Sequence, residues 1–334
     1  MKRYIYITVI IFAIALIACK REKRHADLTG IDFKVKIERF DSAFWNIDTT
    51  KTAEEFTRLQ KQYPDIMPIY TENIVRFGHP DSAITHYTYN LFRKDSAVQQ
   101  LYNDALATYT DMSDIEHDLT TAFRRARYFL PQFPTPTVYS HVSGLNQSMV
   151  VSESFISLSI DNYLGTDYHL YEHIGIYNYQ RNNMCRQKVA SDYITAWISS
   201  EFSTSVADNL LSDMIHHGKI LYVTSVLLPE TPEHIIMGYT PEQWNWVKEN
   251  EANMWNTLIS TKDLYTTNMI DKTRYIKDGP FTLAFTQESP GRAAVYIGWQ
   301  IVESYMRRNP EVSIQQLLQQ PDAQIILNRS NYKP

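Results

Sequence analysis

The sequence is short of cysteine, of glycine and of net charge. It has 2 cysteines and 10 glycines in 334 residues, and 32 basic against 37 acidic side chains. If Cys19 belongs to the amino-terminal signal described below, Cys185 has no partner for an intramolecular disulfide, and the fold must rest on packing. We interpret Cys185 as a small buried residue rather than a nucleophile. The slightly acidic balance argues against a nucleic-acid partner.

The sequence also lacks the motifs of several enzyme classes. It contains no P-loop, no dinucleotide-binding glycine fingerprint and no G-x-S-x-G nucleophile elbow. None of its 10 histidines is followed by glutamate, so the H-E-x-x-H zinc motif is absent. We therefore expect no cofactor.

The amino terminus carries the most specific pattern in the chain. Lys2 and Arg3 precede an apolar run over residues 5–16, and the tetrapeptide Leu-Ile-Ala-Cys ends at Cys19. About 12 apolar residues are too few to span a bilayer but suit a secretory signal. The pattern is that of a bacterial lipoprotein signal, and several acyl chains on Cys19 would anchor the protein stably. An ordinary cleaved signal peptide with a coincidental cysteine is the alternative.

This signal divides the chain into three parts. We expect residues 1–18 to be a signal peptide, residues 19–28 to be a disordered tether, and residues 29–334 to form a single domain. The lipid would hold the protein in the cell envelope, on the inner or the outer membrane. The basic residues that follow Cys19 favour the periplasmic face, where an envelope protein is the expected partner.

The order of the segments predicts a predominantly helical α+β protein with a small sheet in the middle of the chain. The first third is typical of helices, including one over residues 52–62 and one capped by Asp95. Three strand patterns follow, at residues 137–142, 149–151 and 155–160. The last of them alternates, which implies one buried and one polar face. Two long helices are expected next, at about residues 187–202 and 205–222.

Two capping boxes predict further helix starts. Ser113 with Glu116 should begin one helix, and Thr240 with Gln243 should begin another. A helix over residues 291–308 carries two apolar stripes, so we expect it to be buried on both sides.

Four stretches together resemble a known family. They are the lipoprotein signal, Ile37-Glu38-Arg39-Phe40-Asp41, Ile160-Asp161-Asn162-Tyr163-Leu164-Gly165, and Pro290-Gly291 followed by Ile297-Gly298-Trp299-Gln300-Ile301-Val302. In this order and spacing they resemble the gliding motility lipoprotein GldB family of Bacteroidota, over nearly all of the mature chain. That family is similar to a group of predicted zinc-dependent proteases with a zincin-like fold. The resemblance implies an envelope lipoprotein linked to gliding machinery in motile species and present in non-motile relatives.

The residues that a zincin needs for catalysis are missing. Such a peptidase requires two histidines at i and i+4 on one helix, with a glutamate as general base, and a third ligand farther along. The helix expected to bear them, residues 188–202, has no histidine. His216-His217-Gly218 stands where the resemblance implies an acidic ligand. We therefore expect a degenerate, non-catalytic zincin-like domain that acts as an assembly or interaction factor. An extended partner segment could add to residues 155–160, which we expect to be an edge strand.

A metal-dependent hydrolase is the alternative. His169-Leu170-Tyr171-Glu172-His173 fits the inverted zinc motif H-x-x-E-H, and on a helix His169 and His173 would share one face. His217 could complete a metal site with either of them. The segment nevertheless follows a glycine turn, and its composition is typical of an irregular segment on the surface. For His217 we favour a structural hydrogen bond with Asp213, which would raise the pKa of the imidazole.

A third hypothesis is a glycan- or small-ligand-binding lipoprotein. It rests on aromatic clusters alone, and core or half-exposed packing is the commoner use of such residues. The clusters are Trp244, Trp246 and Trp255, and Tyr163, Tyr168, Tyr171, Tyr177 and Tyr179.

Overall fold

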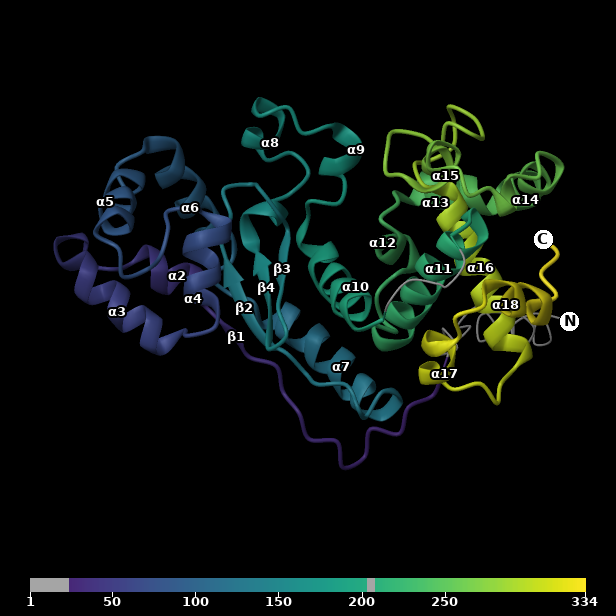
Figure 1. Cartoon of the computed structure of the whole chain (residues 1–334), viewed down its shortest axis with the longest axis horizontal. Coiled ribbons are helices and arrows are strands. Elements are labelled where there is room, and N and C mark those ends of the chain that lie inside the picture. Colours follow the sequence, from purple (N-terminus) through teal and green to yellow (C-terminus); the bar gives the residue numbers. More distant parts are fainter. Residues whose placement is uncertain (1–23, 203–207) are drawn as a thin grey trace, which may run out of the picture.

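The computed structural model describes residues 24–202 and 208–334 (Figure 1). The predicted signal peptide, the candidate lipidation residue Cys19 and residues 205–207 of a predicted helix lie outside the described residues. Within them the chain is predominantly helical with one small sheet in its middle, as predicted.

The sheet contains four strands in the order β1-β2-β4-β3. The strands are β1 (Ile37–Glu38), β2 (Thr137–His141), β3 (Met149–Val151) and β4 (Phe155–Ser159). β1, β2 and β4 run parallel, with Val138 paired to both Ile37 and Ile156, and β3 runs antiparallel to β4. A parallel pairing needs a long crossover, and here about 100 residues, most of them helical, separate β1 from β2.

β4 lies inside the sheet, so the expectation that it forms an edge is wrong. β2 and β3 flank it, and an extended partner segment cannot add there. The polar face expected from its alternation is wrong as well, because all five β4 residues are buried. Its serines are satisfied inside the protein, since Ser157 Oγ lies 2.7 Å from His141 Nδ1 and Ser159 Oγ donates to Asp161 Oδ1 at 2.6 Å.

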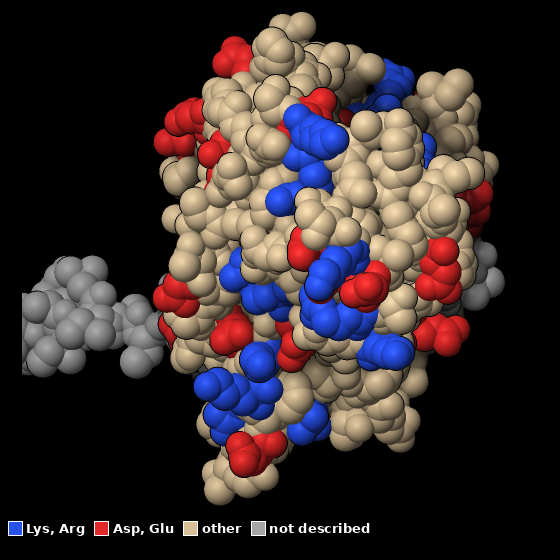
Figure 2. Space-filling model, turned by 90° about the vertical axis from the view of Figure 1, so that its left-hand side faces the viewer, with Lys and Arg blue, Asp and Glu red and all other residues tan. Residues whose placement is uncertain are grey.

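The helices of the first third are α2 (Phe40–Trp45), the 3-10 turn η1 (Thr49–Lys51), α3 (Thr52–Gln62), α4 (Ile66–Ile69), the π-helical turn η2 (Tyr70–Ile74), α5 (Ala83–Phe92), α6 (Ser96–Thr108) and α7 (Ser113–Phe129). α7 lies in the middle of the molecule and contacts α10 and α11 (Figure 1). α2 to α6 pack at one end, and Figure 2 shows this side of the molecule, with Lys and Arg side chains interspersed among Asp and Glu. Phe44 is the centre of an aromatic cluster there, with its ring centroid 4.8 Å from that of Tyr70 and 5.0 Å from that of Tyr89, both edge to face. Tyr139 and Phe155 join this cluster from the sheet.

The second half of the chain is helical. Its elements are η3 (Ile160–Tyr163), α8 (His169–His173), α9 (Asn178–Arg181), η4 (Arg186–Lys188), α10 (Val189–Glu201), α11 (Leu210–Leu227), α12 (Glu233–Met237), α13 (Pro241–Glu249), α14 (Glu251–Ser260), η5 (Asp263–Tyr265), α15 (Met269–Ile276), α16 (Ala293–Arg308), α17 (Ile314–Gln319) and α18 (Ala323–Ser330). α16 is buried on both sides, as its two stripes predicted. The helix that begins at Thr240 is interrupted at Asn250, where α13 ends and α14 begins.

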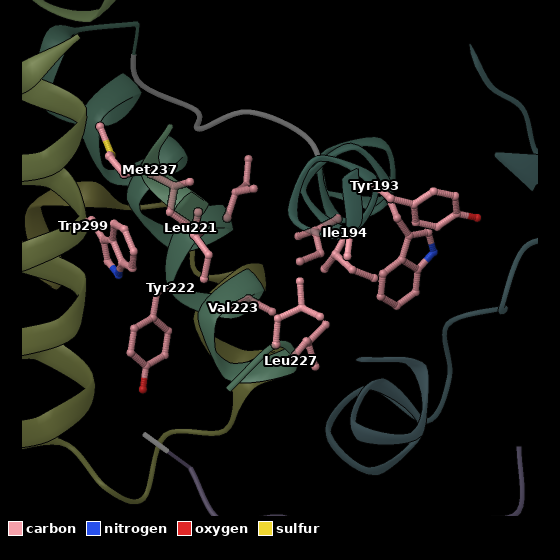
Figure 3. Close-up of a cluster of buried hydrophobic side chains, with 14 of the residues drawn as sticks. Tyr193, Ile194, Leu221, Tyr222, Val223, Leu227, Met237 and Trp299 are labelled. Carbon is pink, nitrogen blue, oxygen red and sulfur yellow. The ribbon is translucent and has the colours of Figure 1, made fainter. Parts of the chain in front are cut away.

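α11 and α16 cross at two glycines. A Cβ added to Gly218 would lie 2.5 Å from the carbonyl carbon of Gly298, and a Cβ added to Gly298 would lie 2.5 Å from that of Met214. The helix backbones therefore touch at this point, which only glycine permits. Figure 3 shows the core beside the crossing, where Trp299 of α16 lies near Leu221 and Tyr222 of α11, and Tyr193 and Ile194 of α10 lie beyond them.

The predicted helix caps are formed in most cases. Asp95 accepts from two backbone N–H groups of α6, and Thr240 and Gln243 complete their capping box. The box at Ser113 is wrong, because Glu116 accepts instead from the backbone N–H of Ile37 at 2.9 Å. The carboxylate that could have capped α7 thus fixes the start of β1.

Residues 24–36 form an extended strap that crosses α7 (Figure 1). The Arg24 guanidinium donates to the carbonyls of Pro310 at 3.0 Å and Val312 at 3.1 Å, just beyond the end of α16. The backbone carbonyl of Arg24 accepts from the buried Arg125 of α7 at 2.7 Å. The expectation of a disordered tether is therefore wrong for residues 24–28, which contact the body of the protein.

Candidate functional site

The segment of the inverted zinc motif forms the short helix α8 on the surface. His169, Glu172 and His173 are all exposed, whereas Tyr171 between them is buried and donates to the carbonyl of Asp161 at 2.6 Å. His169 Nε2 lies 3.2 Å from the Gln100 amide, and Glu172 pairs with Arg181 at 3.4 Å. The helix thus turns its tyrosine inward and its candidate metal ligands toward solvent.

His217 lies on α11 beside the glycine crossing, and its expected pairing with Asp213 is wrong. Asp213 pairs instead with the buried Lys272 of α15, at 3.0 Å. Although His217 keeps more than a third of its surface exposed, the protein atoms around its ring lower the pKa of the imidazole, and Arg292 and His216 lower it further. The pKa is shifted opposite to the predicted direction, because the carboxylate that would have raised it is paired elsewhere.

The start of α10 is built around a lysine and a carboxylate. Lys188 Nζ pairs with Asp192 Oδ1 at 2.6 Å, and Asp192 also accepts from the Tyr163 hydroxyl at 3.0 Å. Burial raises the pKa of the neighbouring Cys185 thiol. Cys185 was predicted to be buried, and it is half-buried. Over the described ranges, no three His, Cys, Asp or Glu side chains are placed to hold a metal ion. Nor is any helix of these ranges long and apolar enough to cross a bilayer.

The candidate site is a groove of about 720 Å³ between α7, α10 and α12. We call it the acidic groove. Its walls come from three segments far apart in the sequence: Asp114, Ile115 and Asp118; Arg186, Gln187 and Ala190; and Glu230, Thr231, Pro232, His234 and Ile235. Helix packing brings these segments together, since α10 contacts α7 and α12 contacts η4.

The groove holds one ion pair and an excess of carboxylates. Arg186 binds Asp114 through two bonds of 2.8 Å and 2.5 Å, and it also donates to the carbonyl of Asp111 at 2.6 Å. The guanidinium lowers the pKa of Asp114, while partial burial raises that of Asp118. With Arg186 neutralised by Asp114, Asp118 and Glu230 leave the groove negatively charged, which favours a cationic ligand group.

Sequence reasoning missed the acidic groove entirely. Each wall is a short and unremarkable stretch of chain, and no spacing rule connects positions 114, 186 and 230. The one available signal was Asp114 and Asp118 at i, i+4 on a helix, where two like charges side by side are unfavourable without a partner. That partner is Arg186, which lies 72 residues farther along.

Two of the stretches that carried the family resemblance form buried polar junctions. Asp41 is buried, accepts from Ser140 Oγ at 2.7 Å and pairs with Arg39 at 2.7 Å. Asp161 is fully buried and accepts from the backbone N–H groups of Ser143 at 3.0 Å and Leu145 at 2.7 Å. Both carboxylates follow parallel strands and tie loops to the sheet. Their described partners are side chains and backbone of the fold, so we assign them a structural role.

Fold and site together define a helical α+β protein with an acidic groove on a packed helical framework. Its stretches at residues 37–41, 160–165 and 290–302 serve that framework, including the Gly298 crossing. The chain belongs to the family of the gliding motility protein GldB, whose model matches residues 21–334. The name of this family includes the term for a lipoprotein, which suggests association with the cell envelope.

No curated protein and no solved structure matches the chain. The zincin-like likeness implied by the resemblance therefore stays a prediction.

Proposed function

We propose that this protein is a lipoprotein anchored through Cys19 that faces the periplasm and acts without catalysis as an assembly or interaction factor of the envelope. Family membership supports the link to gliding motility. The acidic groove supports the interaction role. It is roomy, negatively charged and lined by charged and backbone groups of three different elements.

The groove fits a partner segment that presents lysine or arginine. Asp118 and Glu230 are exposed and form no ion pair within the described residues. A cationic side chain between them would form ion pairs with both carboxylates in a partly enclosed site. Ile235, which lines the groove and is partly exposed, offers apolar surface for the stem of such a side chain.

The interaction role is tested by charge reversal in the native cell. A photo-crosslinking amino acid at Gln187, which lines the groove, should trap an envelope protein. The double variant Asp118→Lys/Glu230→Lys should reduce that crosslink at least tenfold, because each new lysine repels a basic partner. The matched control Glu54→Lys/Glu72→Lys alters exposed acids outside the groove and should leave it unchanged. Equal crosslinking by both double variants would count against the groove.

The anchor is tested separately by the mass of the mature protein. Intact-mass spectrometry should find acyl chains on Cys19 and none in the Cys19→Ser variant. A mature chain that begins at another residue, or carries no lipid, would refute the lipoprotein assignment without bearing on the groove.

The rival assignment as a hydrolase makes a distinct prediction. A metallohydrolase that uses His169, Glu172 and His173 would hold one equivalent of zinc after purification without chelator and lose it in His173→Ala. We expect no such stoichiometric metal, because Glu172 pairs with Arg181 and His169 lies against Gln100.

A further inference from the structure

The amino-terminal strap is fixed to one particular end of the protein. Arg24 donates to the carbonyls of Met306, Pro310 and Val312, at distances of 3.5, 3.0 and 3.1 Å. These carbonyls lie at and just past the end of α16, where helix carbonyls lack partners of their own. Three acceptors and the bond from Arg125 to the Arg24 carbonyl hold this point of the chain from both sides.

The distance from this point to the proposed lipid is short. Cys19 precedes Arg24 by five residues, and five residues of fully extended chain span at most about 18 Å. If Cys19 carries the lipid, as the proposed function states, the backbone of Arg24 cannot lie farther than this from Cys19, and the end of α16 lies within the length of one arginine side chain beyond it. The body of the protein is then held close to the membrane and is not separated from it by a long flexible linker.

The surface around that point is rich in arginine. Arg307 and Arg308, the last two residues of α16, are exposed, and Arg308 has no ion-pair partner within the described residues. Arg329 of α18 lies beside them and pairs with Glu311 at 2.9 Å. We call Arg24, Arg307, Arg308 and Arg329 the anchor face. Asp27, Glu303 and Glu311 are acidic residues close to these arginines in the sequence, and of them Glu311 pairs with Arg329.

We propose that the anchor face lies against the bilayer and binds the headgroups of anionic lipids. Basic residues close to an anionic membrane surface gain about fivefold in binding each, the value that about 1 kcal/mol per residue gives. A lipid on Cys19 brings the anchor face to the membrane, and its arginines then fix the orientation of the body. The acidic groove, on α7, α10 and α12, does not include this face and stays open to a partner.

Vesicle flotation of the mature chain (residues 19–334) with Cys19→Ser tests this face without the lipid. We expect binding to vesicles that contain phosphatidylglycerol, little binding to phosphatidylcholine alone, and loss of binding at 0.5 M salt. Arg307→Gln/Arg308→Gln should weaken binding about 30-fold, and Arg308→Gln alone about fivefold. The matched control Lys51→Gln/Lys61→Gln removes two exposed charges at the other end of the molecule and should bind like the parent (Figure 1).

Two results would overturn the proposal. One is a mature chain that does not bind phosphatidylglycerol vesicles, and the other is equal weakening by the control pair. Circular dichroism and urea unfolding of each variant verify that it is folded. If the double variant does not fold, the single variant Arg308→Gln still provides the test. Because the assayed chain carries no lipid, its result is independent of the mass measurement that tests the anchor itself.

Discussion

The glycine crossing of α11 and α16 yields a prediction whose sign separates two physical effects. Within a helix, Gly→Ala is normally stabilising by about 1 kcal/mol, because alanine has the higher helix propensity. At Gly298 the new methyl group would lie 2.5 Å from the carbonyl carbon of Met214, whereas unbonded carbons prefer about 3.5 to 4.0 Å. The obstacle is helix backbone, so no side chain can rotate away, and the helices must separate by about 1 Å.

The expected net effect of Gly298→Ala is a loss of about 2 kcal/mol in the free energy of unfolding. Overpacking of a dense core typically costs about 1–3 kcal/mol, and we take the upper end because two backbones meet here. The higher helix propensity of alanine offsets about 1 kcal/mol of this cost. Gly218→Ala should behave alike, since its Cβ would lie 2.5 Å from the Gly298 carbonyl carbon.

Urea unfolding of the mature chain, followed by circular dichroism, measures this loss. Thr57→Ala on the exposed side of α3 is the control and should change stability by less than about 0.5 kcal/mol. A Gly298→Ala protein that is more stable than the parent would refute the backbone contact, because propensity alone would then decide the outcome.

Three further predictions address the core, a cap and the surface. His141 is fully buried beside Ser157, and burial lowers the pKa of its imidazole to about 3. Its contribution to stability is therefore complete above pH 6.5 and falls by about 1.4 kcal/mol per pH unit as the pH drops from 6.5 toward 3. His141→Gln should flatten this part of a plot of unfolding free energy against pH, and an unchanged slope would contradict the assignment. Thr240→Ala removes the capping box of α13 and should cost about 1 kcal/mol in urea unfolding, with Thr57→Ala again as the reference. His169→Ala/His173→Ala should leave the zinc content of the purified protein and its unfolding midpoint unchanged, and a fall in either would revive the metal site.

Local chemistry allowed much of the fold to be predicted. The helix over residues 52–62, the caps at Asp95 and Thr240, and the three predicted strands depend on spacings of two to four residues, which the sequence displays directly. Family resemblance was equally accessible, because it rests on contiguous motifs.

The errors concern pairings between distant residues. Glu116 could cap its own helix or hold Ile37, and Asp213 could reach His217 or Lys272; in both cases the partner that wins is brought by tertiary packing. The alternation of β4 predicted one buried and one polar face, but its serines are buried like the residues between them. The acidic groove belongs to the same class, since Asp114 and Arg186 meet only after α7 and α10 have packed. A single sequence contains no rule for such choices.

The clasp made by Arg24 joins residues 282 to 288 positions apart. A protein secreted amino end first would deliver Arg24 to the far side of the membrane long before the carbonyls of Met306 and Val312 arrive. If this protein is exported in that way, as the proposed function implies, the strap stays unbound through almost the whole of export and binds only when the last helices have folded. The folding of the last helices thus determines how firmly Arg24 is held. A substitution that destabilises residues near the carboxyl terminus should therefore first release the amino-terminal strap.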